Sequence, residues 1–236
     1  MQKAEYRYYE ISQDMPVLVL TGEKWETVYG MDNMHFHNYL EIGYCHYGKG
    51  TVQLAERELT YDAGTITFIP RNIPHRTCPD PEKADEKQKW EYLFVDSDTI
   101  LKKCFADVPE KYTKLKKDLE QKVFVLDQKS NKRAVELMQM IIEEEQCKRS
   151  NYKYAILTFG LNLLLFFDRL DQKETEEKPL SDTMDYIRKL INYMELHYME
   201  NIMAKDLAKS CELSETHMRR IFLEYTNATP LEYLNL

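Results

Sequence analysis

The sequence predicts an α+β protein, with a β-barrel in the first part of the chain and helices in the rest. Three observations support this prediction. Short β-rich segments, most of them bounded by Gly, Pro, Asp or Asn, recur up to residue 96. Apolar residues then recur at helical spacing between residues 98 and 170. A charged stretch, residues 171–180, separates these helices from a last helical set in residues 181–236.

The length and composition indicate a globular protein of one or two domains. The chain has 236 residues, of which 43% are hydrophobic and 31% are charged. It begins without an apolar signal segment, and its longest apolar run, Ala155 to Phe167, is too short to cross a bilayer. Five cysteines without repeated spacing indicate reduced thiols. We therefore expect a cytoplasmic protein with no membrane partner.

The strands and helices give four segments. We expect a barrel in residues 1–97, a helical segment in 98–170, a linker in 171–180 and a helical domain in 181–236. Six stretches predict the strands: 17–22, 41–50, 51–56, 58–64, 65–70 and 90–96. Three stretches predict the helices of the second segment: 98–105, 131–148 and 151–170.

Helix 131–148 has an apolar stripe, and helix 151–170 is apolar nearly all round. The stripe consists of Ala134, Leu137, Met138, Ile141 and Ile142. A lone surface helix needs only one apolar face. These helices are therefore expected to cover the barrel, to pair with their copies in a second chain, or both.

A group of histidines and one glutamate lies in the predicted barrel. His35 and His37 are two residues apart, so on a strand both side chains point to one face, and Glu41 keeps the same parity. His75 follows the strand at 65–70 and a short turn. Three imidazoles and one carboxylate that converge inside a barrel can bind a divalent metal such as Zn, Mn, Fe or Ni.

Two motifs around these residues resemble the cupin fold. HFHNYLEIGYCHYG contains His35, His37, Glu41 and Gly48 at cupin spacing, and GTITFIPRNIPH contains Gly64, Pro70 and His75. The resemblance implies a double-stranded β-barrel. It also implies two kinds of occupant for one cavity, a metal ion or an organic effector such as a sugar. Tyr44, Trp90 and Tyr92 are expected to add walls to that cavity.

Residues 201–227 predict two short helices joined by a tight turn. Met218, Ile221 and Phe222 share one face of the second helix, and Ser214 is placed to cap its N-terminus. The exposed face then presents Thr216, Arg219 and Arg220. This is the pattern of a DNA-binding helix-turn-helix, although an ordinary helical hairpin has the same periodicity.

The stretch LAKSCELSETHMRRIF, followed by TPLEYL, resembles the AraC family of transcription regulators. The resemblance implies that Thr216, Arg219 and Arg220 contact promoter DNA, that the barrel senses a small-molecule effector, and that the chain forms a homodimer and is not an enzyme. Glu212 stands where the family often has glycine in the turn. The family has a second helix-turn-helix after a connecting helix, and the sequence ends at Leu236, a few residues into that helix, so half of the DNA-contact surface is expected to be missing.

The acidic net charge and the metal-binding residue types leave two alternatives to a DNA-binding regulator. The net charge is −8, and residues 180–236 contain six basic and nine acidic residues, which is unusual for a DNA-binding domain. One alternative is a metal-dependent cupin enzyme, an isomerase or dioxygenase with a helical appendage, in which His35, His37, Glu41 and His75 hold the metal. Another is a sensor or dimerisation module without DNA binding. Operator binding favours the regulator, and turnover with a bound metal favours the enzyme.

Overall fold

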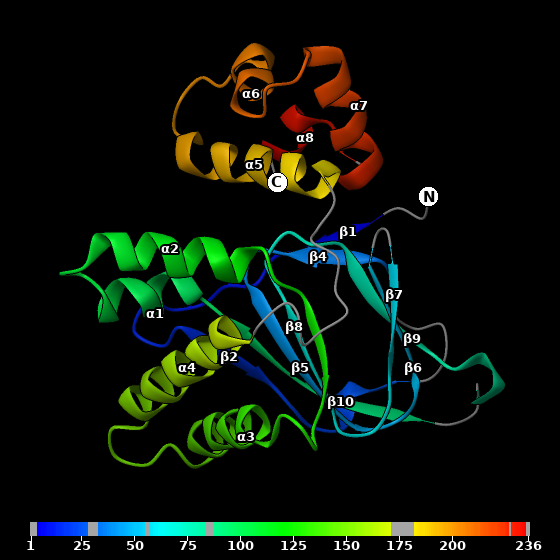
Figure 1. Cartoon of the computed structure of the whole chain (residues 1–236), viewed down its shortest axis with the longest axis vertical. Helices are drawn as coiled ribbons and strands as arrows, with labels where there is room; N and C mark the ends of the chain where they lie inside the picture. The colour runs from blue at the N-terminus through cyan, green and yellow to red at the C-terminus, as the bar shows by residue number, and fades with distance from the viewer. Residues whose placement is uncertain are drawn as a thin grey trace.

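The computed structural model describes residues 4–27, 33–54, 57–83, 87–170, 182–226 and 228–234. Within these ranges the chain forms a barrel of two sheets, helices that cover one side of the barrel, and a separate group of C-terminal helices (Figure 1). The α+β fold class predicted from the sequence is confirmed. Residues 171–180, the expected linker, lie outside the described residues.

Two sheets make the barrel. The five-stranded sheet has the order β1-β4-β9-β6-β7, and the six-stranded sheet has the order β11-β8-β5-β10-β2, with β3 on β10. The bounds are β1 Glu5–Arg7, β2 Val17–Leu20, β3 Glu26–Thr27, β4 His35–His37, β5 Leu40–Tyr47, β6 Gly50–Leu54, β7 Arg57–Tyr61, β8 Thr65–Ile69, β9 His75–Pro79, β10 Gln88–Val95 and β11 Phe124–Asp127. Two 3-10 turns, η1 Glu23–Trp25 and η2 Pro81–Lys83, connect strands.

Strand β5 shows how the barrel divides its side chains between two cores. Ile42 and Tyr44 belong to the apolar core under the helices. Cys45, on the other face, belongs to the apolar core inside the barrel. Because side chains alternate along a strand, Glu41 points into the barrel with Cys45.

The helices of the middle segment are α1 Ser97–Cys104, α2 Pro109–Glu120, α3 Lys132–Cys147 and α4 Tyr152–Arg169. The apolar stripe predicted for residues 131–148 is buried against the six-stranded sheet, in one core with Ile66 and Phe68. Gly160 lets α4 approach α1 and β2 closely, because a Cβ atom at this position would lie only 3.1 Å from Ile100 and 3.8 Å from Val17. The stripe therefore covers the barrel.

The structure corrects one boundary. Residues 98–170 were expected to be helical, but β11 lies among them and pairs with β8, with Phe124 opposite Phe68. The barrel therefore includes residues beyond 97. A four-residue strand between two helices is too short to stand out by periodicity. Helix α2 was also not anticipated, although Pro109 at its first turn is a start signal.

The C-terminal helices are α5 Asp182–His197, α6 Ala204–Ser210, α7 Glu215–Thr226 and α8 Pro230–Leu234. Their core joins Ile187, Leu190 and Ile191 of α5 to the buried residues of α6 and α7. Helix α5 lies on the side of this group nearest the barrel (Figure 1). Among the residues that the structure describes, no helix combines the length and apolar character needed to cross a membrane.

Candidate functional site

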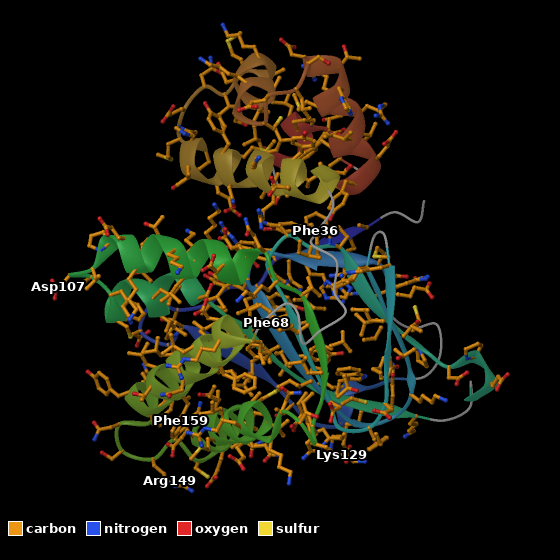
Figure 2. All side chains as sticks on the ribbon, in the orientation of Figure 1. Phe36, Phe68, Asp107, Lys129, Arg149 and Phe159 are labelled. Atoms are coloured by element: carbon orange, nitrogen blue, oxygen red, sulfur yellow. The ribbon has the colours of Figure 1, made fainter. Side chains whose placement is uncertain are left out.

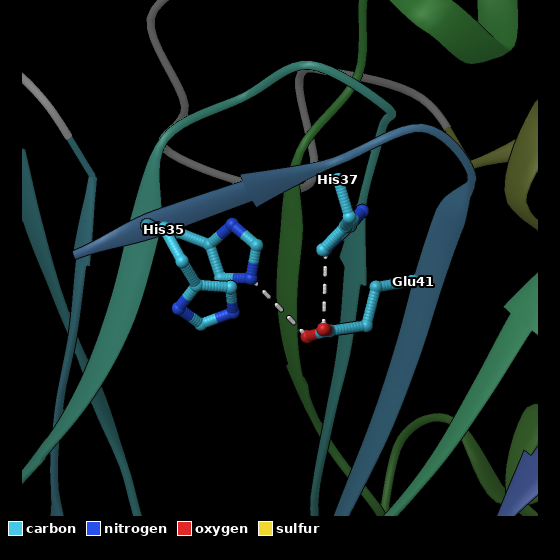
Figure 3. A group of neighbouring side chains, drawn as sticks. His35, His37 and Glu41 are labelled. Carbon is cyan, nitrogen blue, oxygen red and sulfur yellow. Dashed lines mark ion pairs between the residues drawn. The ribbon is translucent and has the colours of Figure 1, made fainter. Parts of the chain in front are cut away.

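Four side chains predicted as a site meet inside the barrel. His35 and His37 lie on β4, Glu41 lies on β5, and His75 begins β9, where it pairs with His35 across the sheet. One donor atom from each lies within 4.8 Å of the others. Figure 3 shows His35, His37 and Glu41 converging. Each of the four is at most 5% exposed, so the group is isolated from bulk water.

A backbone carbonyl fixes each imidazole. The Nδ1 atoms lie 2.8 Å from the carbonyl oxygen of Asn33 for His35, 2.6 Å from that of Tyr39 for His37, and 2.8 Å from that of Ile73 for His75. A carbonyl oxygen only accepts, so each Nδ1 carries the proton and donates it. The Nε2 atoms of His37 and His75 then face Glu41 at the centre of the group. Metal-binding histidines are oriented in this way by their second nitrogen.

Glu41 is the centre of the group. Its Oε2 lies 3.2 Å from Nε2 of His37 and its Oε1 lies 3.4 Å from Nε2 of His75, and dashed lines mark these pairs in Figure 3. Burial acts to raise the pKa of Glu41, but the His75 and His37 rings outweigh burial and hold the pKa well below its usual range. Burial lowers the pKa of His35 to about 2 and also lowers the pKa of His37. The group therefore contains a buried carboxylate, and its His35 and His37 rings resist protonation.

The aromatic residues predicted as walls lie in different places. Tyr44 is on the opposite face of β5 from Glu41, and its hydroxyl donates to Gln128 Oε1 at 3.0 Å. Trp90 and Tyr92 do face the barrel interior, where their rings stack at 5.8 Å, but they pair with Cys45 and Gly43 further along β5. The structure thus does not bring Tyr44 to the cluster, because an even-numbered residue of β5 points toward the helices.

Sequence reasoning missed Phe94 and the bond that Asn72 makes in the turn before His75. Phe94 pairs with Glu41 across the sheet, and its ring lies 4.9 Å from that of His37. The parity of β10 was the available signal for Phe94. In the turn, Asn72 has a φ of 61° and its backbone N–H donates to the His37 carbonyl at 2.8 Å. Asn tolerates this left-handed conformation, in which glycine is the usual residue.

The two short helices joined by a tight turn that the sequence predicts are α6 and α7. Met218, Ile221 and Phe222 are buried, and the Ser214 hydroxyl accepts from the His217 backbone N–H at 3.3 Å as an N-cap. Glu212 has a φ of 59° in the turn. This is the conformation for which glycine is the usual residue.

Three predicted DNA-contact residues are exposed on α7. They are Thr216, Arg219 and Arg220. Arg220 pairs with Glu224 one turn later, with Nη1 at 2.9 Å from Oε1. Arg219 instead borders a groove of about 400 Å³ together with Lys205 and Glu215. Arg220 would therefore have to break its contact with Glu224 before it binds another group, whereas Arg219 has no such contact with Glu224 to break.

One of three comparisons with known proteins, the match to a family model, agrees with the sequence resemblance. Residues 18–98 match the family model described as the AraC-like ligand binding domain. A comparison with curated protein sequences returns no match. Among solved structures, the chain is similar to an apo variant of ToxT from Vibrio cholerae strain SCE256, with 12% identity, coverage of 93% of this chain and 96% of that chain, and a TM-score of 0.41.

Two further structures are similar at 12% and 14% identity. The AraC-like transcriptional activator CuxR shares 12% identity over 84% of this chain and 65% of its own, with a TM-score of 0.36. ToxT with a bound unsaturated fatty acid shares 14% identity over 92% of this chain and 94% of that chain, with a TM-score of 0.29. The family match, by contrast, includes His35, His37, Glu41 and His75 within its range. Residues 18–98 therefore match an AraC-like ligand-binding domain, the kind of domain that the sequence resemblance implies for the barrel.

Proposed function

We propose that this protein is a cytoplasmic, homodimeric transcription regulator that binds promoter DNA through α7 and binds an effector inside its barrel. The observation that supports DNA binding is the capped helix-turn-helix of α6 and α7, with Thr216 and Arg219 exposed on the second helix. In such motifs the second helix enters the major groove with its N-terminal residues toward the bases. The AraC-like ligand-binding domain in the same chain supports the effector site.

The charge of the chain sets an expectation for its affinity. Lys205, Lys209, Arg219 and Arg220 are the basic residues of α6 and α7, and the whole chain has a net charge of −8. Phosphate neutralisation supplies most non-specific affinity, so few cations mean weak binding to random DNA. A small number of phosphate contacts also gives a shallow dependence of affinity on salt.

The burial of the barrel cluster favours a regulator over a metal-dependent enzyme. Catalysis by a metal needs a coordination position that the substrate can reach. The four clustered side chains are at most 5% exposed. A bound effector that only changes the protein conformation does not need a coordination position that remains accessible to a substrate.

The proposed dimer uses the outer face of α4. Tyr154 is 72% exposed, and Leu157, Leu161 and Leu165 follow at helical spacing and are only partly buried. Exposed apolar area of this kind marks interfaces. Leu161→Glu is expected to convert a dimer to a monomer in sedimentation velocity, whereas Asn162→Glu, one position away and already exposed, leaves the dimer intact. A wild-type monomer at high concentration would count against the dimer.

The decisive experiment is selection of DNA by the full chain. Random duplexes are bound to the protein, recovered and sequenced over several rounds, at low salt because weak binding is expected. We expect one enriched motif with guanines at positions reached by Arg219. A parallel selection with Arg219→Ala and Met218→Asp checks that the motif depends on a folded α7. Recovery of unrelated sequences by the wild type would refute sequence-specific binding.

A further inference from the structure

We propose that Leu223 is a fourth base-reading residue of α7, and that Leu223 and Thr216 contact the methyl groups of two thymines about three base pairs apart. This inference rests on the proposed function, because it names the kind of DNA site that α7 reads. DNA binding is tested by selection and the methyl contacts by replacement of single thymines, so the two can fail separately.

Leu223 is an apolar residue that the fold leaves in contact with water. It is 48% exposed, whereas Met218, Ile221 and Phe222 of the same helix are at most 4% exposed. Those three residues belong to the apolar core that α7 shares with α5 and α6. Single exposed leucines are common at protein surfaces. The position of Leu223 on the helix therefore carries the argument, and its exposure alone does not.

Leu223 lies on the same stripe of α7 as the three residues already proposed to contact DNA. Thr216, Arg219, Arg220 and Leu223 follow one another at steps of three, one and three residues, and all four are exposed. Such steps keep side chains on one face of a helix. The recognition helix of homeodomains reads the major groove with four residues at this spacing. Leu223 completes the same set in α7.

The stripe itself contains no acidic residue. The two glutamates of α7 stand one residue outside it at either end, Glu215 before Thr216 and Glu224 after Leu223. One residue corresponds to about 100° around the helix axis, so both carboxylates lie at the edges of the stripe. Glu224 is also paired with Arg220. The face that would meet the bases is therefore apolar and basic.

The barrel approaches α7 from the opposite face of the helix. The ring of Phe222 meets that of Tyr233 at 5.5 Å, and the Tyr233 ring lies 6.3 Å from that of Phe36 at the end of the barrel. Figure 2 labels Phe36 at this end, below the C-terminal helices, and shows the side chains of α7 extending outward. The stripe is thus turned away from the contact with the barrel and is accessible to a DNA groove.

The apolar atoms of the stripe match one feature of the major groove. Thymine presents a methyl group there, and threonine methyls and other apolar side chains contact it. Thr216 and Leu223 are seven residues apart, about 10 Å along the helix axis, and successive base pairs rise about 3.4 Å. A helix that follows the groove therefore brings these two residues to base pairs about three steps apart, with Arg219 and Arg220 between them.

The methyl contacts are tested with the full chain and the DNA motif that the wild type enriches. Each thymine of the motif is replaced singly by uracil, which lacks only the methyl group, and affinity is measured by fluorescence anisotropy. Burial of one methyl group is worth about three- to fourfold in affinity. We expect a loss of this size at two thymines, about three base pairs apart, and no change at other thymines.

Two variants assign these thymines to residues. In Leu223→Ala, replacement of one of the two thymines by uracil should no longer lower the affinity. In Thr216→Ser, which keeps the hydroxyl and removes the methyl group, replacement of the other should have no effect. Both residues are exposed, so neither variant removes core packing. Leu196→Ala is the matched control, because Leu196 is 79% exposed on α5, and it should keep both losses.

The possible outcomes separate this inference from the proposed function. Full sensitivity to uracil in either variant, or a motif in which no thymine responds to uracil, would overturn the methyl contacts and leave sequence-specific DNA binding intact. Absence of any enriched motif would refute both, because the wild type would then not bind DNA sequence-specifically.

Discussion

The barrel cluster and the exposed face of α7 are two groups of polar side chains that the protein holds in opposite ways. In the barrel, the side chains themselves are buried and each imidazole is fixed by a backbone carbonyl. On α7, Thr216 and Arg219 are exposed, and only the opposite face of the helix, Met218 and Phe222, is fixed by packing. The first group is therefore sensitive to charge and protonation, whereas the second is sensitive to the packing beneath it.

The largest change in stability is expected from removal of the packing beneath the exposed face of α7. Phe222 is fully buried, and its ring meets Tyr233 edge-on at 5.5 Å. Phe222→Ala should lower the free energy of unfolding by about 3–5 kcal/mol in urea titrations and abolish DNA binding. Leu223→Ala, at a neighbouring position that is 48% exposed, should change stability by less than about 0.5 kcal/mol. Equal effects of the two variants would show that α7 does not pack as described.

The barrel cluster should instead make stability depend on pH. The pKa of His35 is lowered to about 2, while an unfolded histidine titrates near 6.5. Below pH 6.5 the unfolded chain binds more protons at His35 than the folded chain does, so the free energy of unfolding falls as the pH falls, by about 2 kcal/mol for this ring between pH 6.5 and 5. The lowered pKa of Glu41 keeps its contribution intact in this window, because that contribution is lost only as pH falls through the folded pKa.

This pH dependence is measured by urea titration at several pH values with a chelator present. His35→Asn, which removes one ring, should lose a large part of the slope between pH 6.5 and 5. A variant of the exposed His46 should keep the wild-type slope. A wild-type stability that stays flat across the window would contradict the buried, neutral state of His35.

A smaller and more selective effect is expected on α7. Arg219→Ala should cost about 1–3 kcal/mol on the selected DNA motif and less on random DNA, because a bidentate arginine discriminates guanine. Arg220→Ala should cost less, since Arg220 first has to give up its pair with Glu224. Fluorescence anisotropy on both DNAs separates these cases. Equal losses on both DNAs would make Arg219 a phosphate contact, and no loss would remove α7 from the groove.

The sequence predicted best those features that repeat or alternate. The alternation of His35 and His37 predicted their common face, whereas Glu41 joins them from β5 of the other sheet. The spacing of Met218, Ile221 and Phe222 predicted the buried side of α7. Local periodicity failed where an element was short and its partner distant. Strand β11 is defined by its pairing with β8, some sixty residues earlier, and no local pattern of four residues reports such a pairing.

The same limit applies to the site. Tyr44 was predicted to line the cavity because of its residue type. It lies an odd number of residues from Glu41 on β5, so its side chain is on the opposite face of the strand and contacts Gln128. Arg71 lies in a turn that the sequence identified, yet its partners Asn192 and Glu195 come from a helix more than a hundred residues later. Contacts between segments so far apart are set by tertiary packing, which motif spacing does not encode.

The smallest expected effect concerns backbone strain in the two regions. Glu212 in the turn before α7 and Lys148 after α3 both have positive φ, 59° and 48°. This conformation costs a non-glycine residue roughly 1–2 kcal/mol. Substitution by glycine removes the strain, but glycine loses more conformational entropy on folding, so only part of the strain energy is gained as stability. Glu212→Gly and Lys148→Gly should each stabilise the protein by about 0.5–1 kcal/mol. Asn151→Gly, with a φ of 64°, should gain less, because Asn already tolerates the conformation.

The two glycine variants differ in what they should do to DNA binding. Lys148 is remote from α7, so Lys148→Gly should leave the affinity unchanged. Glu212→Gly also removes a negative charge from the turn before α7, which reduces repulsion of phosphates and should tighten binding modestly at low salt. Glu212→Asn separates the two causes, because it removes the same charge and keeps a residue suited to positive φ. Equal tightening by Gly and Asn would assign the gain to charge, whereas tightening by Gly alone would assign it to the geometry of the turn.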